Sequence, residues 1–282
     1  MKLIADSGST KTVWAVLDGT CVNTFETSGY NPSFMSFEEI AKSIAGSFPE
    51  GFPYGQVSEV WFYCAGVTPV QEEPARKMLA GVFCKTPSEN IHATSDTLGA
   101  CRALLGDKPG FAAILGTGMN TCLYDGKDIG FKLPALGFML GDEGGGAYIG
   151  KKYIVDYLRG NMPEKVAQVA AEAIGMDMQG IIEQVYRKPA PNRWCAGFTK
   201  VVADHFEEDG YYWDLVRGAI DDFFWNVVSR YPDYTQFEFN CVGSVGYGFR
   251  DVIELIASQY RMRIGRIIKS PIEGLIEYHS NN

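Results

Sequence analysis

Two short turns rich in glycine, serine and threonine contain residues that could bind an anionic ligand. One turn covers residues 7–12 and follows an apolar run that ends at Asp6, and the other is Gly116-Thr117-Gly118 after the apolar run 111–115. Glycines let backbone amides converge on an anion, and hydroxyl side chains add hydrogen-bond donors. Each turn joins two strand-like runs that end in an Asp-Gly pair. Together they predict a two-sided clamp for a polyphosphate, although either turn alone fits an ordinary β-hairpin.

The first turn also carries charged residues that suit a phosphate site. Asp6 could anchor Mg²⁺ through water, because magnesium keeps much of its hydration in proteins. Lys11 could approach phosphate as a point charge. An exposed lysine in a turn, without a role in binding, explains its position equally well. The stretch lacks the GxxxxGK[ST] spacing of a Walker A loop.

A third acidic residue, Asp96, opens a predicted helix directly after the short predicted strand 91–95. An aspartate at such a place is usually a helix cap. As a general base it would accept a proton from an attacking hydroxyl and orient that oxygen in line with phosphate. The residue pattern alone leaves both interpretations open.

Two further glycine-rich segments are candidates for ligand contact. Residues 141–147 place Asp142 and Glu143 among four glycines, and the apolar residues 136–140 before them predict a loop that is not freely exposed. Gly243-Ser244-Val245-Gly246 stands at a predicted strand-to-helix junction, where open α/β sheets bind ligands. A plain turn at the start of a helix is the alternative for this last segment.

The apolar patterns supply elements that could position these residues. Strands are predicted over residues 2–6, 12–17, 22–27, 57–64, 91–95, 111–115, 121–124, 237–242 and 263–268. Helices are predicted over residues 37–48, 71–83, 96–105, 141–157, 163–186, 192–207, 212–230, 249–259 and 271–279. The pattern restarts after residues 106–110, so the sequence predicts two similar α/β domains that face each other.

Composition narrows the classes of function. The chain has 282 residues, 46% hydrophobic and 21% charged, which suits a globular protein with a sizeable core. Its net charge of -9 argues against general binding of nucleic acid or anionic membranes. Seven scattered cysteines without a CxxC pair fit a reducing compartment. With no signal peptide and no membrane-length apolar run, a cytoplasmic location is expected.

The ordered set of motifs resembles the sugar kinase, actin and heat-shock chaperone ATPase superfamily, and within it the N-acetylglucosamine kinases. The likeness covers nearly the whole chain and is carried by residues 5–12, 116–120, 141–144 and 241–245. It implies an α/β protein of two ribonuclease H-like domains, the actin-like ATPase fold, with a nucleotide cleft between them. The expected domains are residues 1–107 with 270–282, and residues 108–269 with a helical insertion.

The resemblance also implies a role for each candidate residue. Asp6 would organise Mg²⁺, and Asp96 matches the catalytic aspartate. The residues that would hold the phosphates of ATP are Gly8, Ser9, Thr10, Lys11, Thr12, Gly116, Thr117 and Gly118. The residues that would meet its adenosine side are Gly243, Ser244 and Val245. The residues that would contact the sugar are Asn31, Asn120, Asp142 and Glu143.

The implied activity is ATP- and Mg²⁺-dependent phosphorylation of an amino sugar by a cytoplasmic homodimer. N-acetylglucosamine and its 6-phosphate are the first choice, with Asp96 as general base. Three departures from the family pattern leave the sugar open. Met119 stands where serine is usual, Gly145 stands where serine or alanine is usual, and residues 134–137 lack the common glycine pair.

Other functions within the same superfamily remain as alternatives. An ATPase that activates a partner enzyme, like the activators of 2-hydroxyacyl-CoA dehydratases, would bridge an iron–sulfur cluster with closely placed cysteines, and no such pair is evident in the sequence. A non-catalytic sugar sensor would carry an N-terminal helix-turn-helix, whereas the first hairpin here begins at residue 3. A kinase for a different sugar is the third alternative.

Overall fold

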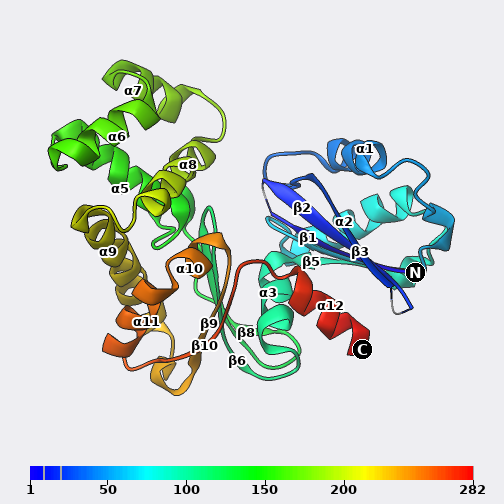
Figure 1. The fold of residues 1–282 in the computed structure, drawn as a ribbon. Coiled ribbons are helices and arrows are strands. Elements are labelled where there is room, and N and C mark those ends of the chain that lie inside the picture. Colours follow the sequence, from blue (N-terminus) through cyan, green and yellow to red (C-terminus); the bar gives the residue numbers. More distant parts are fainter. Residues whose placement is uncertain (9, 20, 282) are drawn as a thin grey trace. The chain divides into compact units, whose positions relative to one another are not determined.

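Residues 1–8, 10–19 and 21–281 are described by a computed structural model of the chain (Figure 1). They form two compact units, one of Met1–Lys108 with the segment from Pro271 to the C-terminus, and one of Pro109–Ser270. Each unit contains one five-stranded sheet with helices packed on it. The predicted fold class, an α/β chain with two similar units, is confirmed.

The two sheets share one topology. The strands of unit 1, in sheet order, are β3 (Cys21–Ser28), β2 (Lys11–Asp18), β1 (Lys2–Ser7), β4 (Glu59–Cys64) and β5 (Ile91–Ser95). Those of unit 2 are β8 (Ile129–Phe131), β7 (Met119–Tyr124), β6 (Gly110–Leu115), β9 (Glu238–Val242) and β10 (Arg263–Ile268). In each unit the first three strands form an antiparallel meander, and the fourth and fifth continue the sheet in parallel. The hairpin repeat seen in the sequence is therefore a repeat of whole sheets.

Helices cover both faces of the unit 1 sheet. They are α1 (Phe37–Ser47), α2 (Pro69–Val82), α3 (Asp96–Leu105) and α12 (Ile272–Asn281), with short 3-10 turns at Tyr54–Gln56 and Ser88–Asn90. Val60 and Phe62 of β4 point into the aromatic core beside Trp14 and Phe83. This alternation follows from the two-residue period of a strand, which sends neighbouring side chains to opposite faces.

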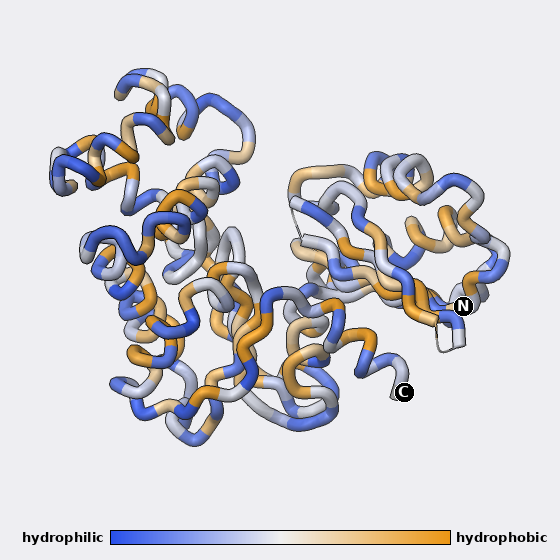
Figure 2. The backbone as a smooth tube through the Cα atoms, viewed as in Figure 1, coloured by the Kyte–Doolittle hydropathy of each residue, from blue (hydrophilic) through white to orange (hydrophobic). Residues whose placement is uncertain are grey.

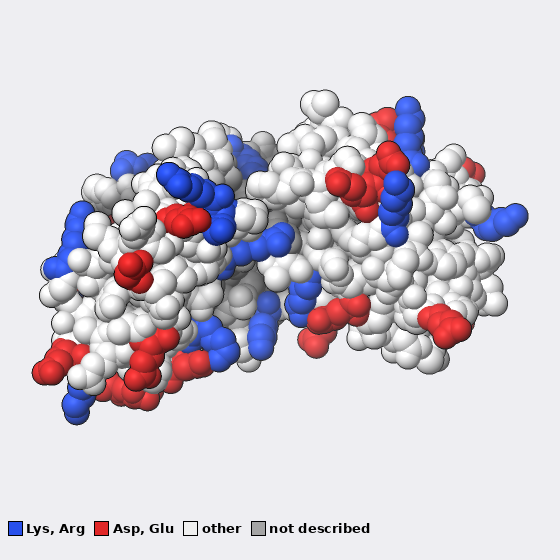
Figure 3. Space-filling model, turned by 90° about the horizontal axis from the view of Figure 1, so that it is seen from above, with Lys and Arg blue, Asp and Glu red and all other residues white. Residues whose placement is uncertain are grey.

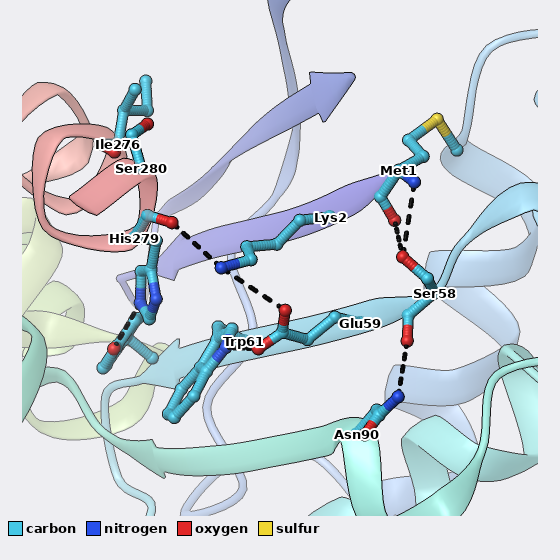
Figure 4. A network of polar contacts seen from close by, with 10 residues as sticks. Met1, Lys2, Ser58, Glu59, Trp61, Asn90, Ile276, His279 and Ser280 are labelled. Carbon is cyan, nitrogen blue, oxygen red and sulfur yellow. Dashed lines mark hydrogen bonds and ion pairs between the residues drawn. The ribbon is translucent and has the colours of Figure 1, made fainter. Parts of the chain in front are cut away.

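The C-terminal helix α12 is bonded to the other face of this sheet. Lys2 pairs with Glu59 at 3.3 Å, and its Nζ donates to the carbonyl oxygen of His279 at 2.9 Å (Figure 4). The hydroxyl of Tyr63 lies 2.8 Å from Nε2 of His279 and accepts a hydrogen bond from Arg102 at 2.7 Å. Helix α12 shows hydrophobic and hydrophilic residues in alternation along its length (Figure 2), as expected for a helix with one buried face.

Unit 2 is richer in helices. They are α4 (Gly137–Leu140), α5 (Gly146–Arg159), α6 (Glu164–Ile174), α7 (Met178–Arg187), α8 (Pro191–Asp204), α9 (Gly210–Asn226), α10 (Ser244–Gly248) and α11 (Arg250–Gln259), with 3-10 turns at Val228–Arg230 and Tyr234–Gln236. A large apolar core joins β6 and β9 to α5, α8, α9 and α11. None of the helices in the described residues has the length and apolar character that a bilayer crossing needs.

One predicted helix is wrong as a single element. The segment 163–186 folds as α6 and α7, because Gly175 ends α6 in the left-handed conformation and Asp177 caps α7 by accepting from the amide of Gly180. Glycine is a common residue at the end of a helix, and aspartate is a common N-cap, so Gly175 and Asp177 mark the end of one helix and the start of the next. The short elements β8 and α4 were not predicted.

We expect acid to destabilise the protein through His279, whose side chain is buried. Burial and, to a smaller extent, the nearby charges of Lys2 and Arg102 lower the pKa of His279 from 6.5 to about 3. The unfolded chain binds a proton below its ordinary pKa while the folded chain does not, so the free energy of unfolding falls as the pH drops from 6.5 toward 3. At about pH 5 the loss is on the order of 2 kcal/mol.

Urea unfolding at about pH 7.5 and about pH 5 measures this loss. The His279→Gln variant should lose less stability between the two pH values than the wild type, and His205→Gln in unit 2 is the matched control. Equal losses in wild type and His279→Gln would contradict the expectation.

Candidate active site

The carboxyl edge of the unit 1 sheet brings together residues that are far apart in the sequence. Strands β1, β4 and β5 run parallel, and their last residues Ser7, Cys64 and Ser95 are register partners. Asp6 precedes Ser7 and Asp96 follows Ser95, so both predicted acids lie at the same sheet edge. Ligands of open α/β sheets bind at this kind of edge.

Asp6 is in an environment that disfavours its ionised form. The pKa of Asp6 is raised to about 7, mainly by burial and also by the nearby carboxylate of Asp96, while Lys11 acts in the opposite direction. A buried carboxylate beside a second carboxylate is costly to ionise unless a cation is present. This donor set fits a divalent cation such as Mg²⁺, which typically takes one or two carboxylates together with substrate phosphates.

The helix-cap interpretation of Asp96 is wrong. The N-cap of α3 is Ser95, whose hydroxyl accepts a hydrogen bond from the amide of Leu98 at 3.2 Å. Thr97 donates its hydroxyl proton to Oδ1 of Asp96 at 3.3 Å. Capping of α3 therefore does not require the carboxylate of Asp96. Its position is compatible with the predicted role as a base.

The first hairpin is held by close backbone contacts. The amide of Gly8 donates to the carbonyl oxygen of Lys11 at 3.0 Å, and that of Gly29 donates to Thr10 at 3.1 Å. A side chain at Gly29 would meet the carbonyl oxygen of Gly8 at 2.4 Å, so only glycine fits there. Ser9, predicted to contact phosphate, lies outside the described residues.

Two predicted phosphate residues of this hairpin differ in their surroundings. Thr12 is fully buried, and its hydroxyl bonds Ser7 Oγ at 2.8 Å and the carbonyl oxygen of Ser28 at 3.0 Å. Its side chain thus holds the hairpin together, and a phosphate contact of Thr12 stays a prediction. Lys11 is exposed and pairs with Glu26 at 2.5 Å. Such an exposed pair is worth little, so a phosphate could replace Glu26 as its partner.

Asn31 has a structural task in the loop after β3. Its Oδ1 accepts from the amide of Ser33 at 2.9 Å, and its carbonyl oxygen accepts from the amides of Phe34 and Met35. Gly66, with a φ of +82°, leaves room for this side chain, because a Cβ there would lie 2.1 Å from Oδ1. Contact between Asn31 and a sugar stays a prediction.

The second hairpin is bound to the first turn of α5 within unit 2. The amides of Gly146 and Ala147 donate to the carbonyl oxygens of Gly116 and Thr117, each at 2.8 Å. Helix α5 in this way satisfies donors that every helix start leaves open. The turn predicted to hold phosphate is thereby fixed to a long helix.

The acidic loop packs against the same turn. Asp142 adopts a left-handed φ of +61°, which is uncommon for a residue with a side chain. Its Oδ1 accepts from the amide of Met119 at 3.4 Å, and burial raises its pKa. A Cβ at Gly118 would lie 2.7 Å from Oδ2 of Asp142, and one at Gly145 would lie 2.9 Å from the backbone of Gly118. The glycines are needed because the loop and the hairpin touch.

The remaining predicted sugar residues lie near this contact in the chain. Asn120 follows Met119 on β7, and its Oδ1 is buried without a hydrogen-bond partner among the described residues. Such an acceptor is costly unless a bound hydroxyl or water satisfies it. Glu143, next to Asp142, is half-buried. The prediction that the loop 141–147 is not freely exposed is confirmed, because its residues are buried or half-buried, whereas Leu136, Met139 and Leu140 before it are exposed.

The predicted adenosine segment begins against the end of β6. Gly243 has a φ of +132°, and a Cβ there would meet the carbonyl oxygen of Leu115 at 2.2 Å. Ser244 is exposed, whereas Val245 is buried in the core of unit 2, where it supports the loop. Unit 2 therefore gathers the predicted residues Gly116, Gly118, Asp142 and Gly243 around the ends of β6 and β7.

Several contacts of the site were not predicted from the sequence. Ser95 is the cap of α3, and a serine directly before a helix was the available signal. Ser7 is buried and also lies 3.3 Å from the carbonyl oxygen of Tyr30, which ties β1 to the Asn31 loop. No local pattern marks a serine as this kind of link.

Charged side chains of both signs are spread over the face drawn in Figure 3. Among the described residues, no group of three or more His, Cys, Asp or Glu side chains is arranged to hold a metal ion. The chemistry that unit 1 offers is cation binding and proton acceptance by two carboxylates. Unit 2 offers a glycine-rich turn with an adjoining carboxylate and amide, which suits anions and hydroxyl groups.

Comparison with known proteins relates the chain to solved structures. Neither a protein-family model nor a curated protein sequence matches it. A candidate N-acetylglucosamine kinase from Porphyromonas gingivalis is 38% identical, with a TM-score of 0.93, over 100% of this chain and 99% of that one.

Two more distant structures share the fold. A candidate N-acetylglucosamine kinase from Chromobacterium violaceum is 18% identical over 98% of each chain, with a TM-score of 0.73. A ROK family glucokinase from Streptomyces griseus, solved with glucose and AMPPNP, is 15% identical over 99% of this chain and 98% of that one, with a TM-score of 0.60.

We expect Gly145→Ala to destabilise unit 2, although alanine is small. The added Cβ would press on the backbone of Gly118 and on the carbonyl oxygen of Asp142. Backbone cannot rotate away as a flexible side chain can, so the free energy of unfolding should fall by about 1–3 kcal/mol.

The matched control is Gly197→Ala in α8, where a Cβ meets nothing within 4 Å. That variant should gain up to about 1 kcal/mol, because alanine favours a helix interior over glycine. Thermal unfolding of both variants checks the opposite signs. A Gly145→Ala protein as stable as Gly197→Ala would refute the close contact.

Proposed function

Because the chain belongs to the N-acetylglucosamine kinase-like family of the sugar kinase, actin and heat-shock chaperone ATPase superfamily, we propose that it phosphorylates an amino sugar with ATP. N-acetylglucosamine, converted to its 6-phosphate, is the proposed reaction. The observation that carries the proposal is the pair of acids Asp6 and Asp96 at one sheet edge, one of them hard to ionise without a cation. We propose further that the protein acts on its small-molecule sugar as a homodimer in the cytoplasm.

Asp96 is the proposed general base. It accepts the proton of the primary hydroxyl and orients that oxygen toward phosphorus. The position at the start of α3, with Thr97 bonded to one carboxylate oxygen, holds the group in a defined direction. Most of the rate in phosphoryl transfer comes from positioning and charge stabilisation, so a fixed base is what the reaction needs.

Asp6 is the proposed anchor for Mg²⁺. Its raised pKa reflects burial next to the carboxylate of Asp96, which Lys11 compensates only in part. When bound, Mg²⁺ would neutralise charge on the phosphate oxygens. The proposed phosphate contacts of unit 1 come from the first hairpin, from Gly8, Thr10, Lys11 and Thr12 together with Ser9.

Unit 2 contributes the second set of proposed contacts. The backbone of residues 116–118 holds phosphate, with its turn fixed by α5. Gly243 and Ser244 meet the adenosine side, supported by buried Val245. The proposed sugar contacts are Asn31 of unit 1 and the unit 2 residues Asn120, Asp142 and Glu143, and the unsatisfied Oδ1 of Asn120 supports its part.

The general base can be tested with Asp96→Asn. This change keeps the shape of the side chain and removes its ability to take a proton, so sugar-dependent turnover should fall by about a hundredfold or more. Nucleotide binding, measured by titration calorimetry, should change little. Asp107→Asn, an exposed position just after α3, is the control and should behave as wild type. Near-normal turnover in Asp96→Asn would exclude Asp96 as the base.

The substrate class can be tested with a coupled ATPase assay across a panel of hexoses and amino sugars. We expect at least one amino sugar to be phosphorylated, with N-acetylglucosamine the best. Phosphorus NMR of the product identifies the hydroxyl that was modified. Consumption of ATP that is the same with and without every sugar would refute the kinase assignment.

A further inference from the structure

Glu72 of α2 makes a contact with the strand that leads to Asp96. Its Oε1 accepts a hydrogen bond from the hydroxyl of Thr94 at 2.8 Å, in a partly buried position. Thr94 lies on β5, two residues before Asp96. A hydroxyl bond to a carboxylate is stronger than one between neutral groups, so it restricts the strand end firmly.

The neighbours of Glu72 have other tasks. Gln71 forms the capping box of α2 with Thr68. Glu73 pairs with Arg76 at 2.8 Å on the exposed side of the same helix. Among the contacts of the described residues, Glu72 is the one of these three consecutive polar residues whose side chain bonds a strand of the sheet.

The start of α2 is itself tied to the other predicted site residues. In the loop between β4 and α2, the amide of Ala65 donates to the carbonyl oxygen of Ser7 at 2.8 Å. Gly66 in the same loop packs against the side chain of Asn31. Segment 65–72 thus joins the end of β1, the Asn31 loop and the strand before Asp96.

We propose that Glu72 is a positioning residue, which fixes Asp96 through Thr94. This inference rests on the proposed function of Asp96 as general base. Ser95 caps α3 and Asp96 opens it, so the place of the base depends on where β5 ends. Glu72 fixes that end to α2, and the loop that leads into α2 carries the contact with Asn31. A displacement of about 1 Å in a catalytic constellation can lower the rate about a hundredfold.

The contact can be removed from either side. We expect Glu72→Ala and Thr94→Val each to lower kcat about tenfold, with the KM for ATP changed less than about twofold. The double variant should be no slower than the slower single variant, because both changes remove one interaction. Thr94→Ser restores the hydroxyl and should recover most of the activity. Glu73→Ala, on the same turn of α2, should match the wild type.

Hydrogen exchange gives a readout that does not depend on kinase activity. The amides of residues 95–98 should exchange faster in Glu72→Ala and Thr94→Val than in Glu73→Ala. Thermal unfolding identifies any variant that fails to fold, and Glu72→Met, which keeps the length of the side chain and has no oxygen to accept the bond from Thr94, replaces Glu72→Ala in that case.

Normal kcat in a folded Glu72→Ala protein, or additive losses in the double variant, would overturn the inference. Unchanged exchange at residues 95–98 would overturn it as well. If the wild type phosphorylates no sugar, the proposed function fails, and the exchange measurement still decides whether Glu72 fixes this strand end.

Discussion

The cost of a buried carboxylate at the end of β1 governs the organisation of unit 1. Asp6 is surrounded by a sheet edge that removes water, and Asp96 adds a second negative charge nearby. An isolated protein gains nothing from this arrangement, since the ionised form of Asp6 has no full compensation. The surrounding bonds keep the edge in place: Ser7 to Thr12 and Tyr30, and Ala65 to Ser7. An arrangement that costs stability without a ligand is typical of a site that binds a cation.

Unit 2 repeats the topology of unit 1, but its hairpin turn is stabilised by different contacts. Its hairpin turn has no acid at the end of β6 and is instead held by the amides of α5. Here the limiting quantity is the space around three glycines. Gly145 and Gly243 lie too close to neighbouring backbone to carry a side chain, and Gly118 lies too close to the carboxylate of Asp142. Close approach of backbone lets amide groups converge on a small volume, which suits an anion. One topology thus presents carboxylates in one unit and backbone donors in the other.

The sequence was sufficient for the parts that depend on local pattern. Strands with a two-residue period, the glycine-rich turns and the acids at strand ends follow from residues close in the chain. The wrong or missing parts depend on contacts between distant residues. The bond from the hydroxyl of Thr12 to the carbonyl oxygen of Ser28 on β3 is one such missing contact. The exposure of Leu140 and the bond between Glu72 and Thr94 likewise depend on how elements pack, which no local pattern encodes.

The two departures from the family pattern at Met119 and Gly145 meet at one point of unit 2. Gly145 lies against the backbone of Gly118, and Met119 is the next residue, with its side chain in the core and its amide bonded to Asp142. A larger side chain at position 119 fills the core beneath the turn, and the absence of one at position 145 lets the acidic loop close on the turn from the other side. Both changes therefore act on the place of Asp142, while the bonds of Gly116 and Thr117 to α5 do not involve either side chain. Departures of this kind alter the predicted sugar end of the site and leave the predicted phosphate turn intact.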